Sequence, residues 1–497
     1  MKKSEIKKEK VDEWKKKEYA VLRQLIDKRR YEEALTLIAC IADLEYDYNQ
    51  HYYNEKLEES ILEIALLKKE KIFISPVRDQ RSVFFYDGFG FETRGLALIY
   101  IKALSRMFKL VYATGSEHKN NISHLEKQIK ENNGTIIYLK NKKYTDRIQE
   151  LICSIEQYKS QFLFMYTYPN DVVVTVAYAM YKDIAHRFQV NLTDHAFWLG
   201  NKCIDTCIEF REYGGNISRR YRKISENNIA LLPFYPIVNH DEPFMGFPFK
   251  DSRDKHKIVF SGGSLYKTMD KKNEYYSFVR MLLRKYPEMI FWYAGQKSIY
   301  SKELEKLMIE FPQRVFWTQE RRDLYQIMQN VDIYLNTFPI SGGLMIQYAA
   351  VAGTIPIIVK YDDETLGNFL KNEDKIICNS FGEAETKIDK LFNDQLYYKD
   401  TLDLLKDTII TQRDFEEQLY SIIHSGKSKF HISYSCIDVT KQKKIYLDRF
   451  NCTGLDRYLS NKNSTILIRC KASQFAKGTL IKFFSLLWRK FRNGNKV

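Results

Sequence analysis

Apolar and polar residues alternate along the middle of the chain in two patterns that follow one another. Short apolar runs, such as 83–86 and 162–166, have the length of buried strands. Between them lie stretches, such as 146–157, in which apolar residues recur every three or four positions, as on one face of a helix. Repeated strand–helix alternation of this kind predicts a parallel sheet covered by helices on both faces.

The alternation occurs twice, on either side of a stretch with little periodicity. That stretch, 233–256, contains four of the ten prolines and predicts a linker. Two doubly wound sheets joined in this way form a cleft at the carboxyl ends of their strands, where ligands bind in such folds. The expected strands are 72–75, 83–86, 110–113, 135–139, 162–166, 189–192 and 229–232, then 258–261, 289–294, 314–317, 333–336, 355–359 and 375–378. The expected helices are 95–106, 123–132, 146–157 and 171–186, then 275–285, 302–310, 323–330 and 344–351.

The ends of the chain have different patterns from the middle. Residues 1–68 are helical throughout: a charged run is followed by an amphipathic helix that begins at Tyr31 and by a second helix, 56–67. We interpret this pair as a helical hairpin that caps the next domain, with a degenerate tetratricopeptide-type unit as the alternative. Residues 380–425 are also helical and are expected to close the second domain. The predicted regions are 1–68 (helical extension), 69–235 (first domain), 236–256 (linker), 257–425 (second domain) and 426–497 (C-terminal region).

The composition excludes several classes of protein. Of the 497 residues 44% are hydrophobic, which excludes wholesale disorder, and the low glycine and proline content excludes collagen-like or linker-like chains. Lys and Arg (78) outnumber Asp and Glu (63), giving a net charge of +15. This excess favours a polyanionic partner, whether nucleic acid, anionic lipid or a phosphorylated substrate.

The cysteines and the N-terminus bear on the compartment. The eight cysteines include no CxxC pair, and Cys203 and Cys207 have helical i,i+4 spacing without a further ligand nearby, so buried free thiols are favoured over a metal site. Free thiols predict a reducing compartment, and the charged N-terminus lacks the apolar core of a signal peptide. No run of about 18 apolar residues occurs that could span a bilayer. We therefore expect a cytoplasmic protein.

The last part of the chain is strongly basic. No acidic residue follows Asp456, whereas ten Lys and Arg residues do. On a helical wheel of 477–492, Leu480, Phe484 and Trp488 share one face with other apolar residues, and basic residues lie opposite. This pattern predicts a helix in the interface of an anionic membrane, on its inner face, with a core helix as the alternative. Because the charge excess concentrates there and no recognition motif appears, nucleic-acid binding is not expected.

Glycine-containing loops follow three strands of the second half, and one of them is Ala294-Gly295-Gln296. The strand ending near Asn336 leads into Ser341-Gly342-Gly343 and then directly into a helix. A second junction, at the start of the same half, contains Gly262, Gly263 and Lys267. Glycine lets a phosphate approach the backbone, and helix N-termini and lysine favour anions. Since all these loops follow strands of one parallel sheet, we expect them to meet at one edge and bind a diphosphate.

Residues 71–425 resemble the GT-B glycosyltransferases, an α/β superfamily of two doubly wound Rossmann-like domains. The segment Asn336-Thr-Phe-Pro-Ile-Ser-Gly-Gly343 is similar to the donor-phosphate loop of the protein O-GlcNAc transferase branch, and 331–335 and 348–357 are similar to the elements around that loop. The resemblance implies a nucleotide-diphosphate sugar, a UDP-sugar, bound by the second domain, with no other cofactor. The donor-binding residues it implies are Gly262, Gly263, Lys267, Gln296, Trp317, Asn336, Ser341, Gly342, Gly343 and Gln347, with Lys267 stabilising the leaving diphosphate, Trp317 near the base and Gln347 near the ribose.

Two features of the sequence bear on the reaction type. Many retaining members of the superfamily carry Glu where this chain has Gln347 and again eight residues earlier, at Pro339, so inversion is favoured over retention. No Asp-x-Asp precedes an apolar strand, and Asp362-Asp363 lies in a loop without a convincing metal site. A metal-independent reaction is expected, because helix dipoles and basic residues can stabilise the leaving diphosphate.

The first half supplies candidate residues on the other side of the cleft. Its glycine-containing loop carries Gly88, Gly90 and Arg94, and Arg94 is interpreted either as a phosphate ligand or as a solvated charge at a helix end. Asp194 and His195 follow a strand, and His195 is the candidate general base, with a structural histidine as the alternative. Because consecutive side chains point apart, Asp194 is not expected to orient His195. Arg219, Arg220 and Arg222 are expected on a solvated helix face, or in contact with an acceptor phosphate or a membrane.

Together these patterns favour a glycosyltransferase acting on a glycan, lipid-linked or protein acceptor. A nucleotide-sugar 2-epimerase of the same fold is one alternative. A non-catalytic partner subunit of a transferase complex is the other, and a homo- or hetero-oligomer stays open.

Overall fold

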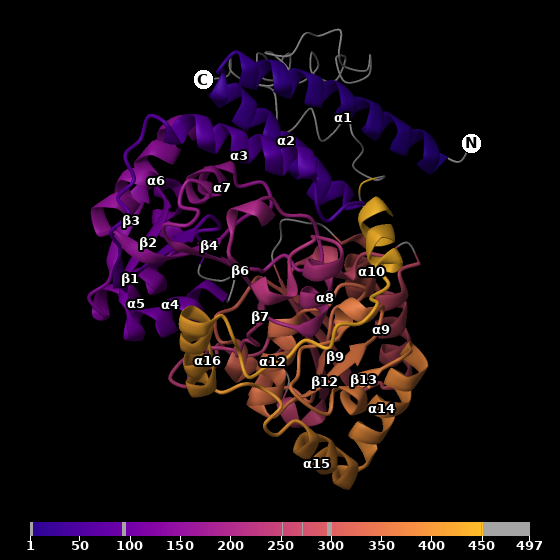
Figure 1. Cartoon of the computed structure of the whole chain (residues 1–497). Helices are drawn as coiled ribbons and strands as arrows, with labels where there is room; N and C mark the ends of the chain where they lie inside the picture. The colour runs from indigo at the N-terminus through magenta and orange to yellow at the C-terminus, as the bar shows by residue number, and fades with distance from the viewer. Residues whose placement is uncertain are drawn as a thin grey trace, which may run out of the picture.

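Two parallel β-sheets and a layer of N-terminal helices make up the molecule (Figure 1). The computed structural model describes residues 3–91, 96–250, 252–270, 272–295, 301–448 and 450. The first sheet has seven strands in the order β3-β2-β1-β4-β5-β6-β7, and the second has six in the order β10-β9-β8-β11-β12-β13. The fold class expected from the alternating pattern, two doubly wound α/β domains, is confirmed.

The first sheet is built from short strands whose side chains are buried on both faces. In β1 every residue from Ser82 to Asp87 is buried, as expected for a central parallel strand. Its strands are β1 (Asp79–Asp87), β2 (Lys109–Gly115), β3 (Thr135–Leu139), β4 (Ser160–Tyr166), β5 (His186–Val190), β6 (Thr206–Glu209) and β7 (Ile229–Leu231). Its helices are α4 (Leu96–Met107), α5 (Ser123–Glu131), α6 (Tyr144–Tyr158), α7 (Val172–Ala179) and α8 (Glu212–Arg220).

The second sheet repeats this plan. The strand order reverses between β8 and β11, as it does between β1 and β4 in the first sheet, and ligands bind at such switch points. Its strands are β8 (Lys257–Gly262), β9 (Met289–Ala294), β10 (Val315–Thr318), β11 (Ile333–Leu335), β12 (Ile355–Val359) and β13 (Ile377–Cys378). Its helices are α9 (Glu274–Lys285), α10 (Lys302–Glu310), α11 (Leu324–Gln329), α12 (Gly343–Ala352), α13 (Glu373–Ile376), α14 (Phe381–Asn393) and α15 (Gln395–Leu404).

Most of the predicted strands and helices lie within a few residues of the observed ones, and the exceptions are short segments. Residues 72–75 form no strand, because the chain turns after α3 and Ser75 donates its N–H to Glu156 (2.9 Å). The four residues of β6 were not predicted, and α7 ends at Ala179 instead of continuing to 186. Runs this short carry no distinctive period, so tertiary packing decides their conformation.

The N-terminal extension consists of three helices, α1 (Lys3–Asp27), α2 (Tyr31–Tyr48) and α3 (Glu55–Lys69), of which α2 and α3 correspond to the two helices of the expected pair. Their apolar faces share one hydrophobic core with α6 and α7 of the first domain. The Glu32 carboxylate accepts the N–H groups of Tyr144 and Thr145 at the start of α6. The extension therefore covers one face of the first domain, as the capping interpretation predicts (Figure 1).

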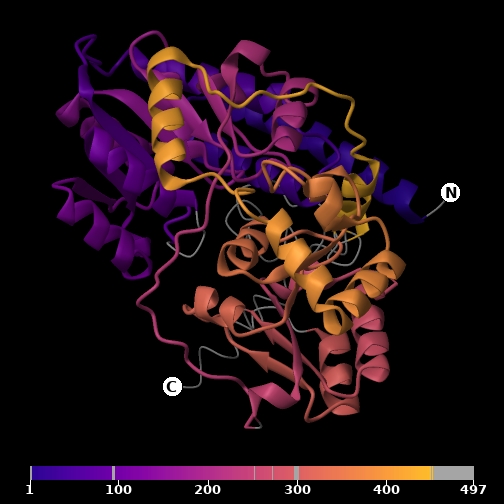
Figure 2. The ribbon, with the colours of Figure 1, turned by 90° about the horizontal axis from the view of Figure 1, so that it is seen from below.

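The chain returns to the first domain after α15. Helix α16 (Gln412–Ser425) packs on α4, with the rings of Tyr100 and Phe415 5.3 Å apart, although it was expected to close the second domain (Figure 2). Residues 432–437 then run along α8, where Asn216 bonds to the backbone of Ser433 and Ser435. Residues 440–448 are helical and return to α2, with the rings of Tyr46 and Tyr446 6.0 Å apart. The predicted interfacial helix at 477–492 lies outside the described residues. Among the helices that the structure describes, none has the length and apolarity needed to cross a membrane.

Candidate functional site

The glycine-containing loops of the second domain meet at the switch point of its sheet. The Lys267 ammonium, after β8, donates to the carbonyl oxygen of Ser341, at the start of α12 (3.0 Å). The N–H of Ile340 donates in return to the carbonyl oxygen of Lys267 (3.3 Å). A Cβ on Gly262 would lie 3.1 Å from the Met345 side chain of α12. The structure therefore brings together the two loops that the sequence analysis selected.

The loop before α12 is held by its own side chains. Asn336 donates from Nδ2 to Ser341 Oγ (3.0 Å) and accepts the N–H of Gly342 at Oδ1 (3.1 Å). Thr337 Oγ1 donates to the carbonyl oxygen of Ile340 (2.7 Å). Asn336 is buried, so its amide shapes the loop from within.

At two positions in these loops only glycine fits. Gly263 has a backbone conformation that other residues rarely adopt, and Gly343 has no space for a Cβ. Gly263 has φ +123°, which side chains rarely adopt, and its Cβ position faces open space. A Cβ on Gly343 would lie 2.3 Å from Asn368 Oδ1. The backbone at Gly263 is thus open on the side that a Cβ would occupy, whereas Gly343 packs directly against Asn368.

Gln347, on the first turns of α12, is almost fully buried. Its Nε2 donates to the carbonyl oxygen of Asn368 (3.0 Å), and its Oε1 is buried with no hydrogen-bond partner among the described residues. A buried acceptor without a partner is rare in proteins. Gln347 can therefore accept a hydrogen bond from a bound hydroxyl or amide.

Of three further predicted residues, the structure describes only Trp317. Trp317 lies on the edge strand β10, two strands away from β8, and is half-buried in the domain core. Gln296, after β9, and Arg94, before α4, lie outside the described residues.

In the first domain, Asp87 organises the loop that carries Gly88 and Gly90. Asp87 Oδ1 accepts the N–H groups of Phe89 and Gly90, both at 2.9 Å, and Oδ2 accepts the Tyr112 hydroxyl (2.7 Å). Gly90 has φ +59°, and a Cβ there would lie 2.1 Å from the ring of His118. Asp87 was not among the residues predicted from the sequence, although an Asp directly before a glycine turn is a common signal.

Replacing Gly90 with alanine is expected to lower the free energy of unfolding by about 2–4 kcal/mol, from the left-handed backbone together with the overlap with His118. The matched control is Gly426→Ala at the end of α16, where φ is +70° and nothing lies within 4 Å of the Cβ position. It carries only the backbone cost of about 1 kcal/mol. Urea unfolding of both variants measures the difference, and equal losses would contradict the predicted overlap.

His195 and Asp194 contact each other, contrary to the expectation from their adjacency. His195 Nδ1 lies 3.2 Å from Asp194 Oδ1, because the irregular backbone after β5 turns both side chains to one side. Asp194 is fully buried, whereas a quarter of the His195 side chain is exposed. Burial opposes ionisation of Asp194, but the Arg211 guanidinium and His195 outweigh it and hold its pKa well below the usual range. Asp194 is therefore an ionised carboxylate that orients His195.

The backbone around His195 is fixed by two distant side chains. The Asn49 amide, at the end of α2, donates to the carbonyl oxygen of His195 and accepts the N–H of Phe197, both at 3.1 Å. Arg222 donates to the carbonyl oxygens of Thr193 (2.8 Å), Asp194 (3.0 Å) and Ala196 (2.6 Å). The expectation of a solvated or ligand-binding Arg222 is therefore wrong, since this side chain is buried and structural.

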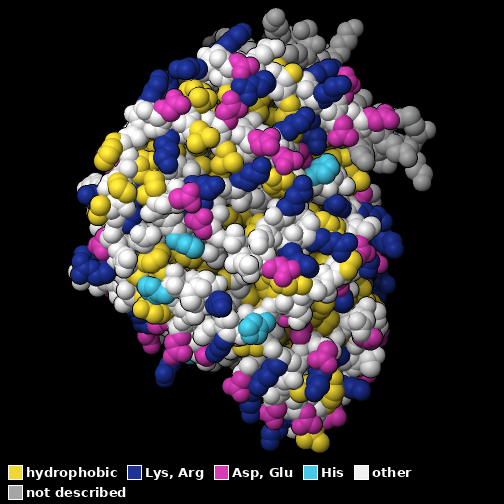
Figure 3. Space-filling model, viewed as in Figure 1, with side chains coloured by type: hydrophobic (Ala, Val, Ile, Leu, Met, Phe, Trp, Pro, Cys, Tyr) yellow, Lys and Arg dark blue, Asp and Glu magenta, His cyan; other side chains and the backbone are white. Residues whose placement is uncertain are grey.

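Arg219 and Arg220 are exposed on α8, as expected for a solvated helix face. Basic and acidic side chains intermingle over the face of the molecule in Figure 3, without a continuous basic surface there.

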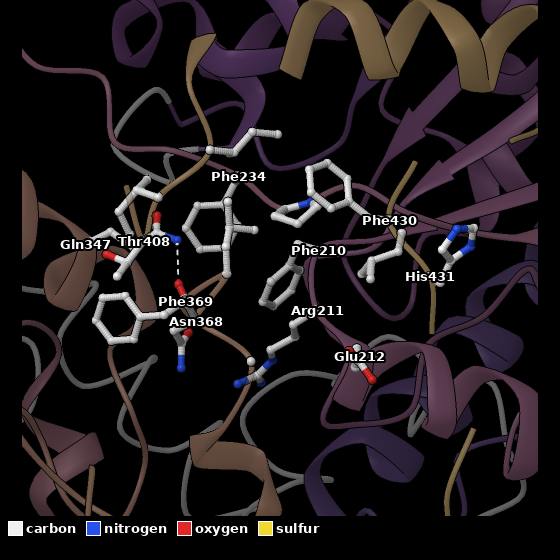
Figure 4. A pocket seen from close by; sticks show the side chains of 16 residues that line it. Phe210, Arg211, Glu212, Phe234, Gln347, Asn368, Phe369, Thr408, Phe430 and His431 are labelled. Carbon is white, nitrogen blue, oxygen red and sulfur yellow. Dashed lines mark hydrogen bonds between the residues drawn. The ribbon is translucent and has the colours of Figure 1, made fainter. Parts of the chain in front are cut away.

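A cavity of about 140 Å³ lies between the two domains (Figure 4). Phe210 and Phe234 from the first domain and Phe369 from the second contribute aromatic walls, and Gln347 lies at its margin. Arg211 lines the same cavity and bridges the domains through its ion pair with Glu364. The candidate base and the candidate donor loops thus belong to two domains in direct contact.

The acidic loop after β12 does not form a metal centre in the described structure. Burial and the neighbouring Glu364 raise the pKa of Asp362 to about 7. Within the described ranges, no group of three or more His, Cys, Asp or Glu side chains could hold a metal ion. Cys203 and Cys207 are buried free thiols, on a 3₁₀ turn and on β6 and not on one helix.

No protein-family model and no curated protein matches the sequence. Among solved structures, an O-GlcNAc transferase mutant from Thermobaculum terrenum matches with a TM-score of 0.51 at 11% identity, over 88% of this chain and 82% of that chain. A glycosyltransferase from Rickettsia africae matches with a TM-score of 0.50 at 12% identity, over 69% of this chain and 98% of that one. A UDP-GlcNAc 2-epimerase from Neisseria meningitidis bound to UDP-GlcNAc has a TM-score of 0.46 at 11% identity, over 68% and 98% of the two chains. With its two parallel sheets and their switch points, the chain has the GT-B fold.

Proposed function

We propose that the protein is a glycosyltransferase that takes a nucleotide-diphosphate sugar in its second domain and an acceptor in its first. The observation that carries the proposal is the convergence of Lys267, the Gly262–Gly263 loop and the start of α12 at the switch point of the second sheet. An ammonium group, a helix N-terminus and the open backbone at Gly263 together favour a diphosphate. The fold alone would fit a wider range of ligands.

The residues present divide the chemistry between the two domains. In the tautomer that donates Nδ1–H to Asp194, His195 Nε2 is free to take the proton of the acceptor hydroxyl. The acceptor oxygen then bonds to the anomeric carbon while the bond from that carbon to the diphosphate oxygen breaks. The electron pair of the broken bond stays on the diphosphate oxygen, and Lys267 and the N-terminus of α12 stabilise the leaving diphosphate. A single displacement of this kind inverts the anomeric carbon.

Gln347 fits the nucleoside side of the donor. Its buried Oε1 has no hydrogen-bond partner among the described residues, and a ribose hydroxyl would supply one. UDP as the nucleotide, a glycan, lipid-linked or protein acceptor, and attachment of the basic tail to an anionic membrane are parts of the same proposal.

Replacing Lys267 with alanine is expected to weaken binding of the donor about 10- to 100-fold, the value of one charge-assisted hydrogen bond to a phosphate. Calorimetric titration with a panel of nucleotide-sugars identifies the donor and measures this loss. The control is Lys257→Ala, at the amino end of the same strand and the opposite edge of the sheet, which should bind normally. Equal affinity of Lys267→Ala and wild type would contradict the donor site.

The products of turnover distinguish the alternatives. Transfer that requires an acceptor supports the proposal, whereas conversion of the donor into its C2 epimer without acceptor identifies an epimerase. Absence of binding to every nucleotide-sugar tested would favour a non-catalytic partner subunit.

A further inference from the structure

Arg211, at the start of α8, connects the His195 loop to the second domain. Its Nε and Nη2 donate to Asp194 Oδ2 (2.5 Å) and Oδ1 (3.0 Å), a bidentate contact. Its Nη2 also donates to Glu364 Oε1 (2.8 Å), in the loop after β12. Nη1 donates to the carbonyl oxygens of Glu364 and Leu366. The guanidinium of Arg211 thus joins the Asp194 side chain of the first domain to the Glu364 side chain and two backbone carbonyl groups of the second domain.

Arg211 and its two carboxylate partners are buried, and the neighbouring backbone packs closely on the arginine. Arg211, Asp194 and Glu364 are each at most 5% exposed, so solvent screens their charges little. Gly367 has φ +85°, and a Cβ there would lie 2.9 Å from the Cβ of Arg211, so its backbone packs directly on the arginine. Separation of the domains would strip Arg211 of Glu364 and of both carbonyl oxygens.

The connection continues to the candidate base. Asp194 uses both carboxylate oxygens on Arg211, and Oδ1 also lies 3.2 Å from His195 Nδ1. Asn49 and Arg222, both from the first part of the chain, hold the backbone at His195. The orientation of the Asp194 carboxylate, and through it the imidazole, depends in addition on a group supplied by the second domain.

We propose that Arg211 and Glu364 are positioning residues that align His195 when the two domains are closed as in this structure. The proposal rests on the proposed function insofar as His195 is the base. Under this proposal, His195 is oriented for proton transfer only when the second domain contacts the first through Arg211 and Glu364.

Glu364→Gln tests the proposal with little change of shape. We expect kcat to fall about 10- to 100-fold, the size of effect that a small misplacement of a catalytic group has, and the KM for the donor to change less than twofold. Asp363→Asn is the matched control, because it removes one acidic charge from the residue before Glu364. Asp363 forms an ion pair with Lys360 and not with Arg211. It should keep wild-type kcat.

A double-mutant cycle separates positioning from general stabilisation. In the His195→Ala background, Glu364→Gln should change kcat less than twofold, since the group on which it acts is gone. Loss of kcat by the same factor in both backgrounds, or unchanged kcat in the single variant, would overturn the proposal.

A spectroscopic measurement tests the coupling without turnover. In protein labelled with ¹³C-histidine, the imidazole resonance of His195 is assigned by its loss in His195→Ala. We expect this resonance to shift or broaden in Glu364→Gln and to keep its position in Asp363→Asn. An unchanged resonance in Glu364→Gln overturns the coupling, whereas a failure of the proposed function shows separately, as absence of nucleotide-sugar binding in the wild type.

Discussion

Replacing His195 with alanine is expected to lower kcat about 10²- to 10⁴-fold while leaving donor affinity unchanged, because general base catalysis contributes a factor of this size. The side chain is partly exposed, is oriented by an ionised Asp194 and has its backbone fixed by Asn49 and Arg222. These contacts are those of a positioned base, with Nε2 available for the acceptor. Initial rates with the donor identified by titration measure the effect.

Variants in the two domains should have different kinetic effects. Lys267→Ala should raise the dissociation constant of the donor, whereas His195→Ala should affect turnover at saturating donor. His240→Ala, an exposed histidine in the interdomain linker, is the control and should keep full activity. A His195→Ala enzyme with normal kcat would show that another group accepts the proton, or that none is needed.

Replacing Arg211 with methionine is expected to lower the free energy of unfolding by about 3–5 kcal/mol. Methionine keeps most of the length of the side chain but leaves Asp194 and Glu364 as buried carboxylates without their shared cation. It also removes the donor for two carbonyl oxygens of the second domain. Chemical denaturation, followed by tryptophan fluorescence, measures the loss.

Arg219→Met is the matched control for this prediction. Arg219 lies on the same helix, and its ion pair with Glu226 joins two side chains that are both nearly half exposed. Such surface pairs contribute at most about 1 kcal/mol, so a small effect is expected. A loss in Arg211→Met no larger than that in Arg219→Met would mean that solvent reaches the carboxylates and that the bridge between the domains is weak.

Local sequence patterns determined the architecture and the positions of the glycine-containing loops. The runs that became β1, β3, β9 and β12 have the length of buried strands, and parallel sheets require such runs to alternate with helices. The loops that follow β8 and β11 could be predicted because their glycines are visible in the sequence itself. These glycines are Gly262, Gly263, Gly342 and Gly343. Since carboxyl ends of parallel strands share one edge, their meeting near Lys267 followed from topology.

Only the tertiary structure decided how His195 is supported. Asn49 lies 146 residues before His195, and Glu364 lies 153 residues after Arg211. No period or motif relates residues at such separations. Asp194 was misjudged because an irregular backbone, fixed by buried Arg222, overrides the alternation of neighbouring side chains. The sequence thus determined which segments form the sheets and where glycine-containing loops follow their strands, because those signals are local. The charged contacts between Asp194, Arg211 and Glu364 depend on burial and on long-range contact, which exist only once both domains have folded against each other.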